Sequence, residues 1–130
     1  MMVIDASAIV EFLMGSERGD RVAQAMSESG TLFAPSHLFA EVASAIARLE
    51  RAGTLGDKEA SACMVSLERL PLEAIDGQKL IAASWTLRKR FQIADAFYLA
   101  CSLLLQVPLV TCDGRLARGA NDLIGIRHIV

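Results

Sequence analysis

The chain has 130 residues, of which 53% are hydrophobic and 22% charged, and its formal net charge at pH 7 is −2. This length predicts one folded domain over residues 1–130 with a substantial core, and the composition excludes a disordered chain. A net charge near zero gives no global attraction for nucleic acid, so binding of that kind would need a local basic patch. Three cysteines without close pairing predict neither a disulfide framework nor a zinc site.

No stretch of the sequence predicts a membrane span or a signal peptide. The most apolar segment, residues 94–110, is interrupted by Asp95, Ser102, Gln106 and Pro108. The apolar segment at the N-terminus has no basic region before it and contains Asp5. We therefore expect a cytoplasmic protein with no membrane contact.

Short apolar runs alternate with helical patterns from end to end, and this predicts an α/β fold with a parallel sheet covered on both faces. Ser7 and Ser36 are expected to cap the helices that follow them. In chain order, we expect a strand ending on Asp5, helices over 7–14 and 20–29 with a loop at 15–19 between them, and a strand at 31–34. Helices from Ser36 to about 51 and over 58–69 follow, then a weak strand at 71–75. The rest of the chain is expected to form helices over 76–90 and 94–105, a strand at 109–111, a short helix over 115–120 and an edge strand at 127–130.

Four carboxylates lie in apolar surroundings, unlike the other acids of the chain. Asp5 and Asp113 each follow an apolar strand, whereas Glu41 and Asp95 lie in apolar helical segments. A carboxylate in a dry place is costly unless it is paired or bound to a metal. Each one alone can be explained as a helix cap, a turn residue or half of an ion pair. Together these explanations weaken, because no Lys or Arg stands beside the first three, and converging acids raise one another's pKa.

A divalent cation would resolve this repulsion between acids. Oxygen ligands favour Mg²⁺ or Mn²⁺, whereas Zn²⁺ prefers His or Cys, and we expect His37 and His128 to be structural or surface residues. An acidic site of this kind with open positions can activate water against a phosphodiester. Ser7 and Thr111 each lie two residues from an acid. They either orient a carboxylate or a metal-bound water, or serve only as a helix cap and a strand residue.

These residues resemble the motifs of the PIN domain, in its small bacterial VapC-like toxin form. The matching segments occur in the family's order, span essentially the whole chain, and are residues 3–8, 34–45, 93–100 and 109–117. The resemblance implies a three-layer α/β/α PIN-like fold with a central parallel sheet. It also implies a metal-dependent endoribonuclease using Mg²⁺ or Mn²⁺. Its metal ligands and catalytic acids would be Asp5, Glu41, Asp95 and Asp113, with Ser7 and Thr111 near the metal.

The resemblance further implies the toxin of a type II toxin–antitoxin pair. Such toxins are typically homodimers, held inactive by a cognate antitoxin whose C-terminal segment wraps the groove. Two positions depart from the family's pattern: Ala94 stands where an aromatic residue is frequent, and Gly114 where a basic or polar one is frequent. Both departures bear on the shape of the RNA groove and leave all four acids in place.

Basic residues near the expected site are candidates for RNA binding. Arg115 and Arg118 directly follow Asp113, so we expect them to contact phosphates, although cations at helix ends are also favourable without a ligand. The other candidates are Arg48 with Arg51, and residues 88–90. Aromatic residues make up only 5% of the chain, so no stacking platform for single strands is evident. We expect a structured RNA, such as transfer or ribosomal RNA, recognised by shape and phosphates.

Two other functional classes have to be weighed. A haloacid-dehalogenase-like phosphatase needs a second Asp at position 7, which is Ser7, and a response-regulator receiver needs a Lys after a late strand, where residues 109–114 have none. The non-enzymatic alternative is a catalytically silent PIN-like scaffold that binds RNA or protein. The complete set of four acids argues against it.

Overall fold

Five parallel strands form one sheet in the order β3-β2-β1-β4-β5 in the computed structural model, which describes all 130 residues. The three central strands are buried along their whole length, which explains why their sequences are continuous apolar runs. Val3 pairs with Phe33 on one side and with Leu109 on the other. The strands are β1 (Met2–Ile4), β2 (Leu32–Pro35), β3 (Leu72–Ile75), β4 (Leu109–Thr111) and β5 (Ile126–His128).

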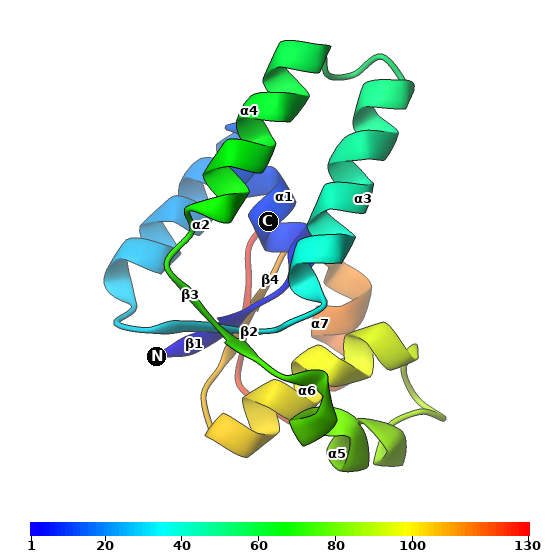
Figure 1. Cartoon of the computed structure of the whole chain (residues 1–130). Helices are drawn as coiled ribbons and strands as arrows, with labels where there is room; N and C mark the ends of the chain where they lie inside the picture. The colour runs from blue at the N-terminus through cyan, green and yellow to red at the C-terminus, as the bar shows by residue number, and fades with distance from the viewer.

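Helices cover both faces of this sheet (Figure 1). Right-handed crossovers between parallel strands place the first four helices on one face and the later ones on the other. This confirms the three-layer α/β/α architecture expected from the sequence. The helices are α1 (Ala6–Met14), α2 (Glu17–Glu28), α3 (Leu38–Arg51), α4 (Asp57–Glu68), the 3₁₀ helix η1 (Gly77–Leu80), α5 (Ile81–Thr86), α6 (Ile93–Leu105) and α7 (Gly114–Ala120).

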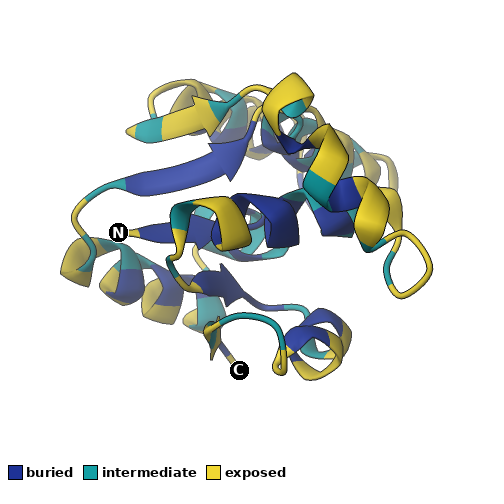
Figure 2. Cartoon of the chain, turned by 90° about the horizontal axis from the view of Figure 1, so that it is seen from below, coloured by how far each residue is buried: buried dark blue, intermediate teal, exposed yellow.

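The core lies between these layers, and Figure 2 shows buried residues along the central strands and on the inner faces of the helices. α6 packs across β1, β2 and β4, so it covers the middle of the sheet on its face. All three cysteines are buried and free. No helix combines the length and the apolar character needed to span a bilayer.

The strand order creates a topological switch point between β1 and β4. From β1 the chain moves toward β2, and from β4 it moves in the opposite direction toward β5. The carboxyl ends of two such strands border a crevice where ligands bind in open α/β sheets. Asp5 directly follows β1, and Asp113 comes two residues after β4. The fold therefore brings both acids to this crevice.

The loop expected at 15–19 is wrong, because α2 already begins at Glu17. The hydroxyl of Ser16 accepts a hydrogen bond from the backbone N–H of Gly19 at 3.0 Å and caps the helix. Gly19 lies where α2 crosses α1, and a Cβ atom there would stand 2.1 Å from the carbonyl oxygen of Glu11. This glycine permits a close helix crossing and does not mark a loop.

The single helix expected over 76–90 is also wrong: η1 and α5 are short, and turns follow up to Arg90. The hydroxyl of Ser84 donates to the carbonyl oxygen of Leu80, and that of Thr86 to Ala83, both at 2.6 Å. Side-chain hydroxyls that occupy helix carbonyls compete with the backbone ladder and favour tight, short turns. The remaining elements agree with expectation to within two residues.

Candidate active site

Asp5 occupies the centre of the crevice and is also the N-cap of α1. Its Oδ1 accepts hydrogen bonds from the backbone N–H of Ala8 at 3.0 Å and from the hydroxyl of Ser7 at 2.6 Å. The hydroxyl of Thr111 donates to Oδ2. The expectation that Ser7 caps the helix is therefore wrong. Of the two roles left open for Ser7 and Thr111, both hydroxyls take that of orienting a carboxylate.

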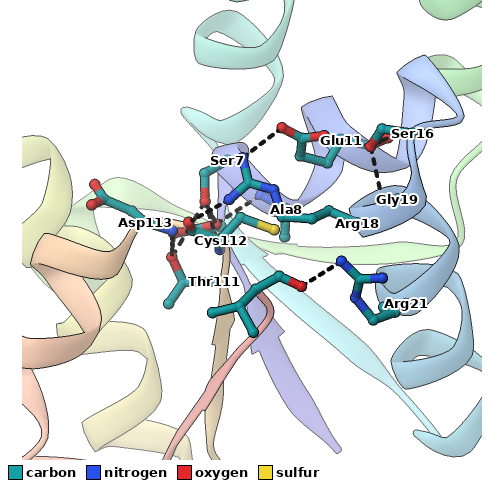
Figure 3. A network of polar contacts seen from close by, with 12 residues as sticks. Ser7, Ala8, Glu11, Ser16, Arg18, Gly19, Arg21, Thr111, Cys112 and Asp113 are labelled. Carbon is teal, nitrogen blue, oxygen red and sulfur yellow. Dashed lines mark hydrogen bonds and ion pairs between the residues drawn. The ribbon is translucent and has the colours of Figure 1, made fainter.

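The two hydroxyls also accept hydrogen bonds, from the loop after β4. Ser7 Oγ accepts from the backbone N–H of Cys112, and Thr111 Oγ1 from that of Asp113, each at 3.0 Å. Each hydroxyl has one proton and gives it to Asp5, so the 3.3 Å approach between the two oxygens is not a donor–acceptor pair. These hydrogen bonds, with those to Asp5, tie the loop after β4 to the start of α1. Figure 3 shows Thr111 and the loop residues Cys112 and Asp113 beside Ser7.

The carboxylate of Asp5 is almost completely buried, with 3% of the residue exposed. Burial raises its pKa to about 6, while the hydrogen bonds from Ser7, Thr111 and Ala8 lower it and the charge of Asp113 raises it slightly further. A carboxylate offers about four lone-pair positions. Three are taken by these donors, so one position on Oδ2 is free.

Asp95 and Asp113 line the same hollow, whose volume is about 190 Å³. Asp95 lies in the first turn of α6, and its pKa is raised by burial and then by the charges of Asp113 and Glu41; Arg115 offsets part of the shift. Asp113 caps α7, where its Oδ1 accepts from the backbone N–H groups of Arg115 at 3.0 Å and Leu116 at 3.3 Å.

Glu41, in the first turn of α3, faces two side chains that the sequence did not single out. The hydroxyl of Tyr98 donates to Glu41 Oε1 at 2.7 Å. His37 Nε2 lies 3.3 Å from the same oxygen and 3.2 Å from the carbonyl oxygen of Ala94. Both neighbours of Nε2 are acceptors, so we assign the proton to that nitrogen, while the buried Nδ1 has no partner. The hydrogen bonds from His37 and Tyr98 hold the pKa of Glu41 below its usual value, against the effect of burial.

His37, expected to be a structural or surface residue, is half-buried and contacts Glu41 through Nε2. It precedes α3 in helical conformation without a side-chain cap, so Ser36 does not cap that helix. The four-residue spacing from His37 to Glu41 places both on one helix face, and this signal was available in the sequence. No comparable signal existed for Tyr98, because its contact depends on the packing of α6 against α3.

The four acids form a chain of electrostatic neighbours at the crevice. Asp113 raises the pKa of both Asp5 and Asp95, and Glu41 also raises that of Asp95. None of the four forms an ion pair with Lys or Arg. As the side chains lie, no three His, Cys, Asp or Glu residues stand close enough to hold one metal ion. The structure thus brings all four acids to one edge of the sheet without closing them around a common point.

The two arginines expected to contact RNA lie differently. Arg115 lines the hollow shared by Asp95 and Asp113. Arg118 is exposed and does not line it. Its guanidinium lies beside Gly114, and a Cβ atom at that position would stand 2.9 Å from it.

The PIN domain family model matches residues 2–122 of the chain. Ribonuclease VapC12 of Mycobacterium tuberculosis is 35% identical over 118 residues, which cover 91% of each chain. The chain is a PIN domain of the VapC ribonuclease family.

Solved structures share this VapC fold at low sequence identity. The toxin–antitoxin complex from Klebsiella pneumoniae matches with a TM-score of 0.72 at 15% identity, over 100% of this chain and 98% of that one. VapC20 of Mycobacterium tuberculosis, described as a sarcin–ricin loop cleaving toxin, matches with a TM-score of 0.69 at 14% identity, over 91% and 94%. At these identities the likeness establishes the fold alone.

Proposed function

We propose that this VapC chain is the toxin of a type II toxin–antitoxin pair and hydrolyses RNA phosphodiester bonds as a metal-dependent endoribonuclease. The observation that carries the proposal is the set of four carboxylates at the switch point, where Asp113 raises the pKa of Asp5 and of Asp95 and none of the four pairs with Lys or Arg. Negative charges gathered in this way favour either protonation or a bound cation. Membership of a ribonuclease family favours the cation.

The donor set fits Mg²⁺ or Mn²⁺, because it consists of carboxylate oxygens. Asp5 keeps one free lone-pair position, and Glu41 Oε2 accepts no hydrogen bond. We therefore assign the metal to Asp5, Glu41, Asp95 and Asp113, with Ser7 and Thr111 fixing Asp5. Side-chain rotation is needed to bring three of the four acids to one point. When bound, the ion would lower the pKa of a water molecule and stabilise the leaving oxygen.

The chain's own residues orient the site and bind the substrate. Ser7 and Thr111 hold Asp5 in one rotamer, and Tyr98 and His37 hold Glu41 through a single oxygen. Arg115, whose charge acts on Asp95, is placed to contact a phosphate of the RNA. Arg118 belongs to the same proposed RNA surface, at its margin.

Two of the related structures support the proposed substrate and partner. The name of VapC20 describes cleavage of the sarcin–ricin loop, which favours a structured RNA, ribosomal or transfer, as the substrate class. The complex from Klebsiella pneumoniae favours a cognate antitoxin protein as the partner. We propose that the toxin works as a homodimer in the cytoplasm.

RNA cleavage by purified protein tests this proposal. The parent protein, Asp95→Asn and the control Asp20→Asn would be incubated with ribosomal and transfer RNA in Mg²⁺, Mn²⁺ or EDTA. Asp20 is an exposed acid in the first turn of α2 and lines neither of the hollows beside the four acids. We expect discrete fragments from the parent and Asp20→Asn in either metal, and none from Asp95→Asn or in EDTA. Cleavage by Asp95→Asn at the parent's rate would refute the assigned site. RNA binding without any cleavage by the parent would favour the scaffold.

A further inference from the structure

A second hollow borders the acidic site, on the face of the sheet covered by α1–α4. Its volume is about 360 Å³, and it lies between α1, the start of α2, α3 and the loop after β4. It meets the acidic site at Glu41 and Ser7. The other lining residues that matter here are Glu11, Arg18, Ala45 and Arg48.

The wall formed by α3 carries Glu41, Ala45 and Arg48 on one helical face. Their spacing of four and then three residues places them one above the other along the helix. The small side chain of Ala45 leaves the space between Glu41 and Arg48 open. A rise of 1.5 Å per residue puts Arg48 about 10 Å along the axis from Glu41. Side chains of a helix lean toward its N-terminus, so the long side chain of Arg48 can reach back toward Glu41.

The charges of the hollow leave one cation without a partner. The guanidinium of Arg18 donates to Glu11 Oε1 at 2.9 Å and to the carbonyl oxygen of Cys112 at 3.4 Å, so Arg18 is already neutralised (Figure 3). The charge of Glu41 is directed to the proposed metal. Arg48 is exposed and forms no ion pair. A hollow with a single free arginine next to a phosphodiesterase site is suited to a phosphate.

We infer that this hollow holds a backbone phosphate of the substrate RNA beside the scissile bond, and that Arg48 binds it. The inference rests on the proposed function and adds to it the path that the RNA strand takes across the protein. The RNA strand runs from the hollow between α1 and α3, across the four acids, to the hollow lined by Asp95, Asp113 and Arg115. Arg51 lies in the same last turn of α3, is equally exposed and does not line the hollow, so it serves as the matched control.

RNA binding measured in a cleavage-silent background tests this assignment. Arg48→Gln and Arg51→Gln would each be made in Asp95→Asn and titrated in EDTA against a sarcin–ricin hairpin RNA and unfractionated transfer RNA. We expect Arg48→Gln to weaken binding about tenfold and to lower the slope of log affinity against log salt by about one. Arg51→Gln should stay within about twofold of its parent, as expected for an exposed charge off the RNA path. Ala45→Leu, which fills the hollow without changing charge, should also weaken binding.

In the cleaving protein, Arg48→Gln should raise KM and leave kcat unchanged, since the contact is equally strong in the ground and transition states. Equal effects of Arg48→Gln and Arg51→Gln, or none from either, would overturn the inference while leaving the ribonuclease intact. So would weakened binding of a protein partner with RNA affinity unchanged, which would assign the hollow to the antitoxin. A parent protein that neither binds nor cleaves any RNA would remove the proposed function and this inference with it.

Discussion

Asp5 has three tasks that conflict when no cation is present. It directly follows β1, it caps α1, and it is the only Asp or Glu among the buried residues of the chain. Capping and the two hydroxyl donors favour its charged form, whereas burial disfavours that form more strongly and raises the pKa. The metal-free protein therefore contains an acid poised to bind either a proton or a cation.

The stability of the metal-free protein should fall as pH rises through the pKa of Asp5. Below its unfolded value of 3.8 the carboxyl is protonated in both states, and the stability linked to the raised pKa is fully present. Between pH 3.8 and about 6 only the unfolded state loses the proton, so the free energy of unfolding declines by up to about 3 kcal/mol and levels off once the folded state is also ionised. Urea denaturation in EDTA between pH 4 and pH 7 measures this decline.

Asp5→Asn should lack that decline, because its amide does not titrate, and Asp20→Asn should keep it. The free energies of unfolding of the parent and of Asp5→Asn should then run in parallel below about pH 4 and diverge above it. Parallel profiles for the parent and Asp5→Asn would show that the burial of Asp5 has no energetic consequence.

Tyr98→Phe should weaken the fold mainly while Glu41 is ionised. The change removes the hydroxyl that donates to Glu41 Oε1 at 2.7 Å and keeps the aromatic ring in the core. Hydrogen bonds to charged groups contribute about 1.5 kcal/mol or more. We expect a loss of about that size in the free energy of unfolding at pH 7 and a smaller loss at a pH low enough to protonate Glu41, whose pKa lies below its usual value. A loss independent of pH would mean that Tyr98 acts through packing alone.

At the scale of elements, the sequence was sufficient to predict a strand or helix wherever burial alone decides its structure. β1, β2 and β4 were predictable because a strand buried on both faces is a continuous apolar run. The breaks around α5 were not, because they depend on the hydroxyls of Ser84 and Thr86, which apolar periodicity does not register. The start of α2 was missed because Gly19 indicates a loop until its contact with α1 is known.

Gly19→Ala should destabilise the protein by opening the crossing of α1 and α2. The added Cβ atom meets the backbone carbonyl of Glu11, which cannot move without shifting the helix. Overpacking of this kind costs about 1–3 kcal/mol. Gly30→Ala is the control, since a Cβ atom there meets nothing within 4 Å. Thermal unfolding should show a clear decrease for Gly19→Ala and little change for Gly30→Ala; equal effects would contradict the role given to this crossing.

The residues of the site also fall into two groups: those that the local sequence identifies and those that only the tertiary fold brings to the site. Each of the four acids interrupts an apolar run, so the sequence alone could single it out. Tyr98 and Arg18 could not be predicted, because each acts on a residue that only the tertiary fold brings near: Glu41 for Tyr98, and the backbone of Cys112 for Arg18. The spacing of His37 from Glu41 was visible in the sequence, and the contact that it indicates is present.

At the scale of the whole molecule, the switch point joins the two helical layers of the fold. One hollow opens toward α1–α3 and the other toward α6 and α7, with the acids between them. Each hollow offers an arginine, Arg48 or Arg115, so a chain with a net charge of −2 can still present cations along one path. Local placement of charge, and not its total, decides whether such a surface binds RNA.

Calorimetric titration with Mn²⁺ is the most direct test of whether these acids form a metal site. The parent and Asp20→Asn should bind with equal affinity, and the affinity should fall as pH drops through about 6, where Asp5 takes up a proton. Asp5→Asn should lose this binding while retaining a folded spectrum. Binding of Mn²⁺ by Asp5→Asn with the affinity of the parent, or no binding by the parent at neutral pH, would contradict the assignment of a metal to the switch point.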